Sequence, residues 1–202
     1  MSITLRKPRL GQLMRVSLAG LACTAAQATP WTLQVRNSAG QPLADAVVAV
    51  ELRGQATKAV GLKADMAQRE RQFQPQLLIV QTGTAVSFPN FDTVRHHVYS
   101  FSTIKVVDIK LYSGTPAEPI VFDKPGVAAL GCNIHDRMSA HIVVVDTPLF
   151  AKTDASGVAK FDLPAGEHQL KVWHLSRKTP ALQGQALTVG AVSGQTAVTL
   201  AD

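Results

Sequence analysis

Apolar and polar residues alternate with a period of two along several short segments of this chain. Residues 169–173 read Gln-Leu-Lys-Val-Trp, and residues 142–145 form a short, wholly apolar run. Alternation of this kind predicts strands that are buried on one face, and a short apolar run is also typical of a strand. Between expected strands at 31–36 and 46–50, the turn-forming residues 37–42 include Asn, Gly and Pro. The pattern therefore predicts an all-β protein.

One segment departs from this pattern, and the composition supports the rest. Residues 63–71 are polar and give the one helical signal, which predicts a short helix or a loop. The chain has 202 residues, 46% hydrophobic and 5% aromatic, with 14 Gly and 11 Pro. This composition disfavours helical bundles, coiled coils, disorder and polytopic membrane proteins, and the length allows one or two small domains.

The positive charge of the chain is concentrated at its start. Four of the 20 Lys and Arg residues, but none of the 14 acidic residues, lie within residues 1–28. An apolar run follows at 16–26, shorter than the ~20 residues that span a bilayer, and it ends in the small residues Ala26 and Ala28. We interpret residues 1–28 as a cleaved secretory signal peptide, with an amphipathic or membrane-anchoring N-terminus as the alternative.

Export would leave a nearly neutral protein in the periplasm. Without residues 1–28, 16 cations stand against 14 acids. We therefore expect no nucleic-acid partner and no stable membrane insertion. Removal of Cys23 with the signal peptide leaves Cys132 as the single cysteine, in a compartment where thiols are usually paired. It could be an inert buried thiol, an intermolecular disulfide partner, a nucleophile or a metal ligand.

The sequence around Cys132 favours a metal ligand. Cys132, His135 and Met138 follow one another at intervals of three, which places a thiolate, an imidazole and a thioether on one short loop. Two histidines and a cysteine with a weak axial methionine form the ligand set of a blue copper site. The second histidine can come from His96 or His97. A catalytic cysteine with His135 as its base lacks an acid partner and leaves Met138 without a role.

Residues 72–145 carry a longer pattern around these ligands. Its positions in chain order are Phe73, Pro75, Leu77 to Val80, Gly83, Val86, Phe88, Asn90, Asp92, His96, Val98, Phe122, Pro125, Gly126, Cys132, His135, Met138 and Ile142 to Val145. In order and spacing they resemble a cupredoxin, the blue copper family that includes plastocyanin and amicyanin. The phrases FPN-x-D-x-x-x-HHVYSFS and GCNIHD-x-M are especially similar to a bacterial periplasmic group labelled methylamine utilisation proteins.

The resemblance implies a Greek-key β-sandwich that holds one type 1 copper through His96, Cys132, His135 and Met138. Position 96 matches the histidine ligand of the family, and strand alternation puts it on the face opposite His97. In the family an asparagine at the position of His97 ties the two ligand loops together. The substitution leaves His97 as either a hydrogen-bonding neighbour of the site or an outward polar residue.

The segments on either side of this region share a different pattern. Pro42 lies in a G-x-P-L motif, and Thr153 begins a T-D-x-x-G motif 111 positions later. These motifs resemble a transthyretin-like or carboxypeptidase-regulatory-like β-sandwich, in which they stand much closer together. We therefore predict a discontinuous sandwich of residues 29–60 and 147–202, into which a cupredoxin domain of residues 61–146 is inserted; a single enlarged cupredoxin is the alternative.

The predicted function is electron transfer, and the protein is expected to be a non-enzymatic carrier and a monomer. In cupredoxins the loop histidine, here His135, is the route for electrons, so Asn133, Ile134, Asp136 and Arg137 would form the docking face for a redox donor and acceptor. A periplasmic copper carrier and a structural binding module are the alternatives. The other histidines, His141, His168 and His174, are expected to have structural or solvated roles.

Overall fold

The structure, a computed structural model, describes residues 28–55, 60–135 and 137–201. Every regular element assigned within these ranges is a strand, which confirms the predicted all-β class. The strands are β1 (Ala28–Arg36), β2 (Val47–Leu52), β3 (Lys63–Asp65), β4 (Ala67–Arg69), β5 (Gln72–Gln74), β6 (Leu77–Gln81), β7 (Thr84–Ser87), β8 (His96–Ser102), β9 (Lys105–Tyr112), β10 (Ile120–Phe122), β11 (Gly126–Cys132), β12 (Ser139–Val145), β13 (Phe150–Lys152), β14 (Val158–Pro164), β15 (Gly166–Trp173), β16 (Gln183–Val189) and β17 (Gly194–Thr199).

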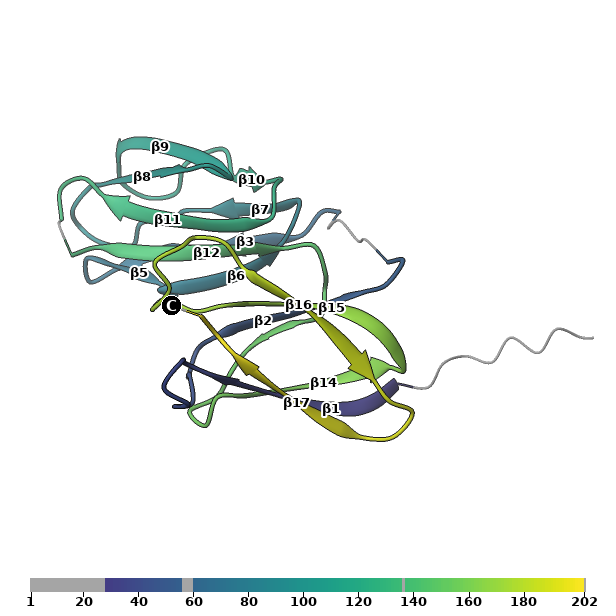
Figure 1. The fold of residues 1–202 in the computed structure, drawn as a ribbon. Helices are drawn as coiled ribbons and strands as arrows, with labels where there is room; N and C mark the ends of the chain where they lie inside the picture. The colour runs from purple at the N-terminus through teal and green to yellow at the C-terminus, as the bar shows by residue number, and fades with distance from the viewer. Residues whose placement is uncertain (1–27, 56–59, 136, 202) are drawn as a thin grey trace, which may run out of the picture.

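The strands form two groups of sheets, one above the other in Figure 1. The upper group contains a five-stranded sheet in the order β6-β12-β11-β8-β9, a three-stranded sheet β10-β7-β3 and the β4-β5 hairpin. The lower group contains the sheets β13-β2-β15-β16 and β14-β1-β17. The upper group uses residues 63–145 only, whereas the lower one combines 28–52 with 150–199. The division into separate domains at the predicted boundaries stays a prediction about autonomous folding.

Each group encloses its own hydrophobic core. Phe73, Phe88 and Phe122 are almost fully buried in the upper core, where aromatic side chains fill the space between the sheets. Leu33 and Leu163 are fully buried in the lower core. Burial of large apolar side chains at about 1.5–3 kcal/mol each is the main stabilising term for such small sandwiches.

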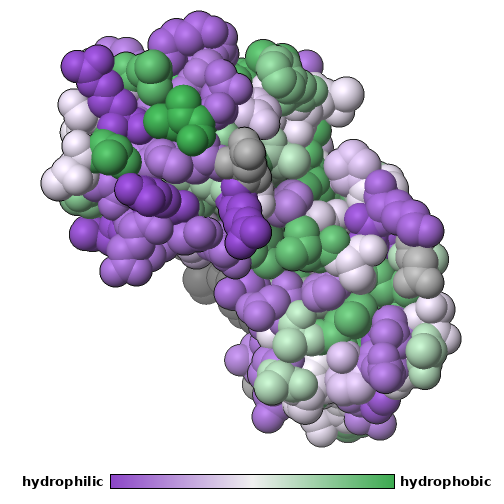
Figure 2. Space-filling model, turned by 90° about the vertical axis from the view of Figure 1, so that its left-hand side faces the viewer, coloured by the Kyte–Doolittle hydropathy of each residue, from purple (hydrophilic) through white to green (hydrophobic). Residues whose placement is uncertain are grey.

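A third cluster of buried residues joins the two groups. Alternate residues of β2 face different cores: Val48 belongs to the lower core and Val47 to the junction. The same is true of β12, in which Ile142 belongs to the upper core and Val143 to the junction. Because both faces of these strands are covered, their sequences are continuously apolar rather than alternating. Figure 2 shows the outcome as two lobes that meet at a waist.

The segment 63–71 contains strands instead of the expected short helix or loop. Its first part, β3, runs parallel to β7 at the edge of a three-stranded sheet. Its second part, β4, pairs with β5 through a turn in which Glu70 and Arg71 have φ of 53° and 56°. Backbone hydrogen bonds to distant strands outweigh local helix propensity in so short a polar segment. No helix within the described residues is long and apolar enough to cross a membrane.

We predict that truncation of the junction tryptophan destabilises the protein strongly. Trp173 is 2% exposed in the junction cluster, so Trp173→Ala should lower the free energy of unfolding by about 3–5 kcal/mol. Urea titration followed by circular dichroism measures this change. Leu175, which is 62% exposed, is the control, and Leu175→Ala should stay within about 0.5 kcal/mol. Equal stabilities of the two variants would contradict a junction that stabilises the fold.

Candidate metal centre

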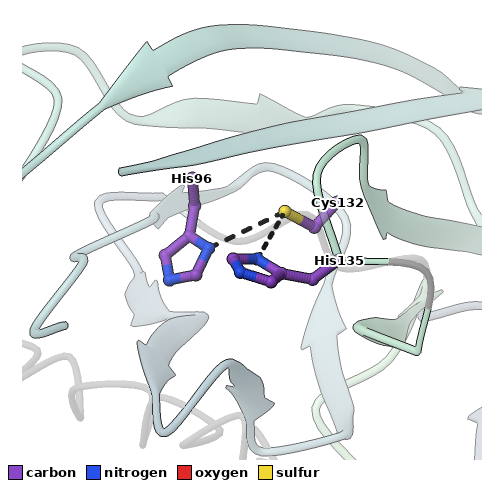
Figure 3. A group of neighbouring side chains, drawn as sticks. All are labelled: His96, Cys132 and His135. Carbon is purple, nitrogen blue, oxygen red and sulfur yellow. Dashed lines mark hydrogen bonds between the residues drawn. The ribbon is translucent and has the colours of Figure 1, made fainter. Parts of the chain in front are cut away.

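The residues of the predicted site come from two neighbouring strands and the loop that follows one of them. His96 begins β8, and Cys132 ends β11. These strands are antiparallel, with Cys132 opposite Val98, so the start of β8 and the end of β11 lie at the same end of the sheet. The loop from β11 to β12 then carries His135 and Met138. Figure 3 shows the two imidazoles on one side of the Cys132 sulfur.

Three potential ligand atoms converge at this end of the sheet. The Cys132 Sγ lies 3.7 Å from His96 Nδ1 and 3.7 Å from His135 Nδ1. The three ligand atoms lie within 4.8 Å of one another, and the two ring centroids are 5.0 Å apart. His96 is fully buried, Cys132 is 5% exposed and His135 is half-buried. The site is thus shielded from water on the side of His96 and more open on the side of His135.

The spacing of these atoms fits a shared metal ion. With metal–nitrogen and metal–sulfur distances of about 2.0 and 2.3 Å and angles between tetrahedral and trigonal, the nitrogen–sulfur separation is about 3.5–3.7 Å. The two observed separations of 3.7 Å lie within this range. The distances suit zinc as well as copper, and a soft thioether nearby favours copper.

Met138 supplies that thioether, and the loop around it is fixed by main-chain hydrogen bonds. Its side chain is 2% exposed and belongs to the same buried cluster as Cys132. The N–H of Met138 donates to the carbonyl of His135 at 2.9 Å, and the N–H of Cys132 donates to the carbonyl of Met138 at 3.1 Å. The loop is therefore closed on itself, with both of its ends at the site.

His97 points away from the cluster, as the alternation along β8 predicts. Its Nε2 lies 2.7 Å from Asp108 Oδ1 on the outer side of the sheet. Its main chain nevertheless links the two ligand segments, because its carbonyl accepts the N–H of Asn133 at 3.3 Å. The structure thus brings His96, rather than His97, next to Cys132.

A carboxylate to which the sequence interpretation gave no role completes the surroundings of His96. Asp92 Oδ2 lies 2.8 Å from His96 Nε2, the ring nitrogen that faces away from Cys132. Burial acts to raise the pKa of Asp92, but hydrogen bonds from Arg71, His96 and Glu70 outweigh it and hold the pKa below its ordinary value. Asp92 precedes His96 by four residues in an irregular loop, where no periodicity relates their side chains. Sequence patterning therefore gave no signal for this contact.

The other three histidines lie outside the cluster. Burial lowers the pKa of His141, whose ring centroid is 5.2 Å from that of Trp173 at the junction. His168 donates from Nε2 to the carbonyl of Pro164 at 2.8 Å. His174 Nδ1 accepts the N–H of Ser176 at 3.1 Å.

The upper group of sheets thus carries a cluster of two histidines and a cysteine, and the loop of this cluster also holds the buried Met138. No family model matches the chain, and no curated protein matches it. Solved structures match part of it; the transthyretin-like resemblance of the flanks stays a prediction.

Three of these solved structures illustrate the similarity. The chain is similar to a reduced mutant form of amicyanin, with 15% identity, 50% of this chain and 99% of that chain covered, and a TM-score of 0.38. It is also similar to a purple cupredoxin from Nitrosopumilus maritimus, with 20% identity, 42% of this chain and 99% of that chain covered, and a TM-score of 0.35. The similarity to the Cu-containing nitrite reductase from Thermus scotoductus has 23% identity, covers 48% of this chain and 26% of that chain, and has a TM-score of 0.40. This chain therefore spans about a quarter of that enzyme.

We predict that His96, but not His97, is required for metal binding. His96→Asn removes one of the three converging donor atoms and should abolish the intense thiolate-to-copper absorption band. His97→Asn is the matched control, because it changes the next residue in β8 and leaves the cluster intact. Visible spectroscopy of both copper-loaded variants checks this. Loss of the band in His97→Asn alone would reverse the assignment.

Proposed function

We propose that the protein is a periplasmic type 1 copper protein that carries single electrons between redox partners. One copper per chain would be held by His96, Cys132 and His135, with Met138 as the weak axial ligand. The observation that carries this proposal is the convergence of His96 Nδ1, Cys132 Sγ and His135 Nδ1, with each nitrogen 3.7 Å from the sulfur.

The way in which the ligands are held suits electron transfer. His96 and Cys132 lie on hydrogen-bonded strands, and the loop with His135 and Met138 is closed by its own main-chain bonds. Copper in such a site cycles between Cu(I) and Cu(II). Because the side chains are fixed by packing and hydrogen bonds, they need little rearrangement when the charge of the site changes.

His135 offers the route for electrons to and from the surface. It is half-buried, whereas His96 is fully buried. Its neighbour Ile134 is 46% exposed, and Asn133 and Arg137 are exposed as well. Asp136, also expected in the docking face, lies outside the described residues. This surface combines an apolar residue with polar and charged ones, which suits a weak, quickly exchanging contact with a partner.

The proposed location rests on the sequence of the N-terminus. The predicted signal peptide, residues 1–28, lies outside the described residues except for Ala28, which begins β1. A free cysteine that is 5% exposed and next to two imidazoles is consistent with a metal-bound thiolate in an oxidising compartment. The redox donor and acceptor would then be other periplasmic proteins, and the carrier would act as a monomer.

The visible spectrum of the mature protein, residues 29–202, tests the proposed function. After loading with Cu(II), we expect an intense thiolate-to-copper band that bleaches with ascorbate and returns on reoxidation. Cys132→Ser, which removes the sulfur, is the control and should stay colourless. A wild-type protein that binds copper or zinc without this band would contradict electron transfer and favour metal carriage or a structural role.

The mixed character of the docking face predicts a weak dependence of partner reduction on salt. The second-order rate of electron transfer with a physiological partner should change less than about tenfold between roughly 50 and 500 mM salt, since no single-sign field steers the encounter. Stopped-flow kinetics at several ionic strengths measure this. A steep fall in the rate with added salt would instead indicate a charged docking patch elsewhere on the surface.

A further inference from the structure

The Asp92 side chain lies between the metal cluster and the β4-β5 hairpin. Its Oδ2 is 2.8 Å from His96 Nε2 on one side. On the other side, Oδ1 accepts the N–H of Glu70 at 2.7 Å and Oδ2 accepts the N–H of Arg71 at 3.0 Å. The side chain is only 15% exposed. A single carboxylate thus connects a candidate ligand with a turn more than 20 residues earlier in the chain.

The turn that holds Asp92 is the two-residue hairpin turn between β4 and β5. Glu70 and Arg71 both have positive φ, of 53° and 56°, as such turns require, and both of their N–H groups donate to the carboxylate. Asp92 is also fixed from its own loop, because its N–H donates to Asn90 Oδ1 at 2.9 Å. The carboxylate is therefore preorganised before any metal binds.

The contact determines which nitrogen of His96 carries the proton. A carboxylate accepts, so the proton of the neutral imidazole resides on Nε2 and the lone pair of Nδ1 is free. Nδ1 is the atom that lies 3.7 Å from the Cys132 sulfur. A hydrogen bond from the remote nitrogen to a carboxylate also raises the basicity of the ligating nitrogen.

We propose that Asp92 is a positioning residue that locks the tautomer of His96 and lowers the reduction potential of the site. This inference rests on the proposed function, because the potential is that of the bound copper. The more basic Nδ1 stabilises Cu(II) more than Cu(I), and the nearby negative charge acts in the same direction. Loss of the carboxylate therefore favours the reduced site.

The neighbouring histidine provides an internal control. His97 makes the same kind of contact, from Nε2 to Asp108 Oδ1 at 2.7 Å, but its ring points away from the cluster. Asp108 is 48% exposed and also pairs with Lys110 at 2.7 Å. Asp108→Asn therefore removes an equivalent carboxylate next to a non-ligating histidine.

The decisive experiment compares Asp92→Asn and Asp92→Ala with Asp108→Asn in the copper-loaded protein. The side-chain amide of asparagine has one acceptor oxygen where the carboxylate has two. Asp92→Asn therefore loses part of the hydrogen bonds to Glu70, Arg71 and His96 with little change in shape. We expect Cu(II) affinity to fall about tenfold more than Cu(I) affinity, which raises the potential by about 60 mV. Voltammetry measures the potential, and Asp108→Asn should leave it unchanged. An unchanged potential in both Asp92 variants, or an equal rise in Asp108→Asn, would overturn the proposal.

Nitrogen NMR of the metal-free protein separates this inference from the proposed function. The wild-type His96 ring should be a single Nε2–H tautomer, and Asp92→Ala should give a mixture of tautomers, while the His97 signals stay constant. If the tautomer is locked in this way but the copper band is absent, the positioning by Asp92 stands and the electron-carrier proposal fails. A mixed tautomer in the wild-type protein would overturn the role of Asp92 whatever the metal does.

Discussion

The antiparallel pairing of β8 with β11 is the constraint on which the rest of the site depends. The register sets Cys132 opposite Val98, which puts His96 and Cys132 at one end of the five-stranded sheet although 36 residues separate them. A shift of one residue would turn His96 outward and His97 inward, since successive side chains alternate between faces. The buried positions of Val98 and Ser100 on the same face as His96 resist such a shift.

The loop ligands depend on β12, the strand that follows them. Its residues alternate between the upper core and the junction, so both faces are buried from Ile142 to Val145. A strand fixed on both faces gives the short loop with His135 and Met138 a rigid end point. The junction with the lower sheets thus borders, through β12, the strand that follows the candidate metal centre, although none of the clustered atoms comes from those sheets.

Two adjacent histidines of β8 each contact a carboxylate, but the surroundings of the two contacts differ. Asp92 is held by two main-chain N–H groups of the β4-β5 turn and contacts a ring whose other nitrogen faces Cys132. Asp108 is half-exposed and shared with Lys110, so its contact with His97 resembles a surface ion pair of small energetic value. Whether such a contact can influence chemistry depends on its burial and on what the other ring nitrogen of the histidine faces, rather than on the carboxylate–histidine pair itself.

The sequence by itself determined the strand class, the Cys132-x-x-His135-x-x-Met138 loop and the opposite faces of His96 and His97, because each follows from local spacing or from a period of two. Tertiary structure alone decided that 63–71 forms strands and that Asp92 meets His96. It also decided how the two faces of β2 and β12 are shared between cores. The strand pairings and the shared cores depend on contacts between segments far apart in the chain, and Asp92 is held by a turn more than 20 residues earlier. The free energy of such contacts outweighs local propensity and leaves no periodic trace in the residues themselves.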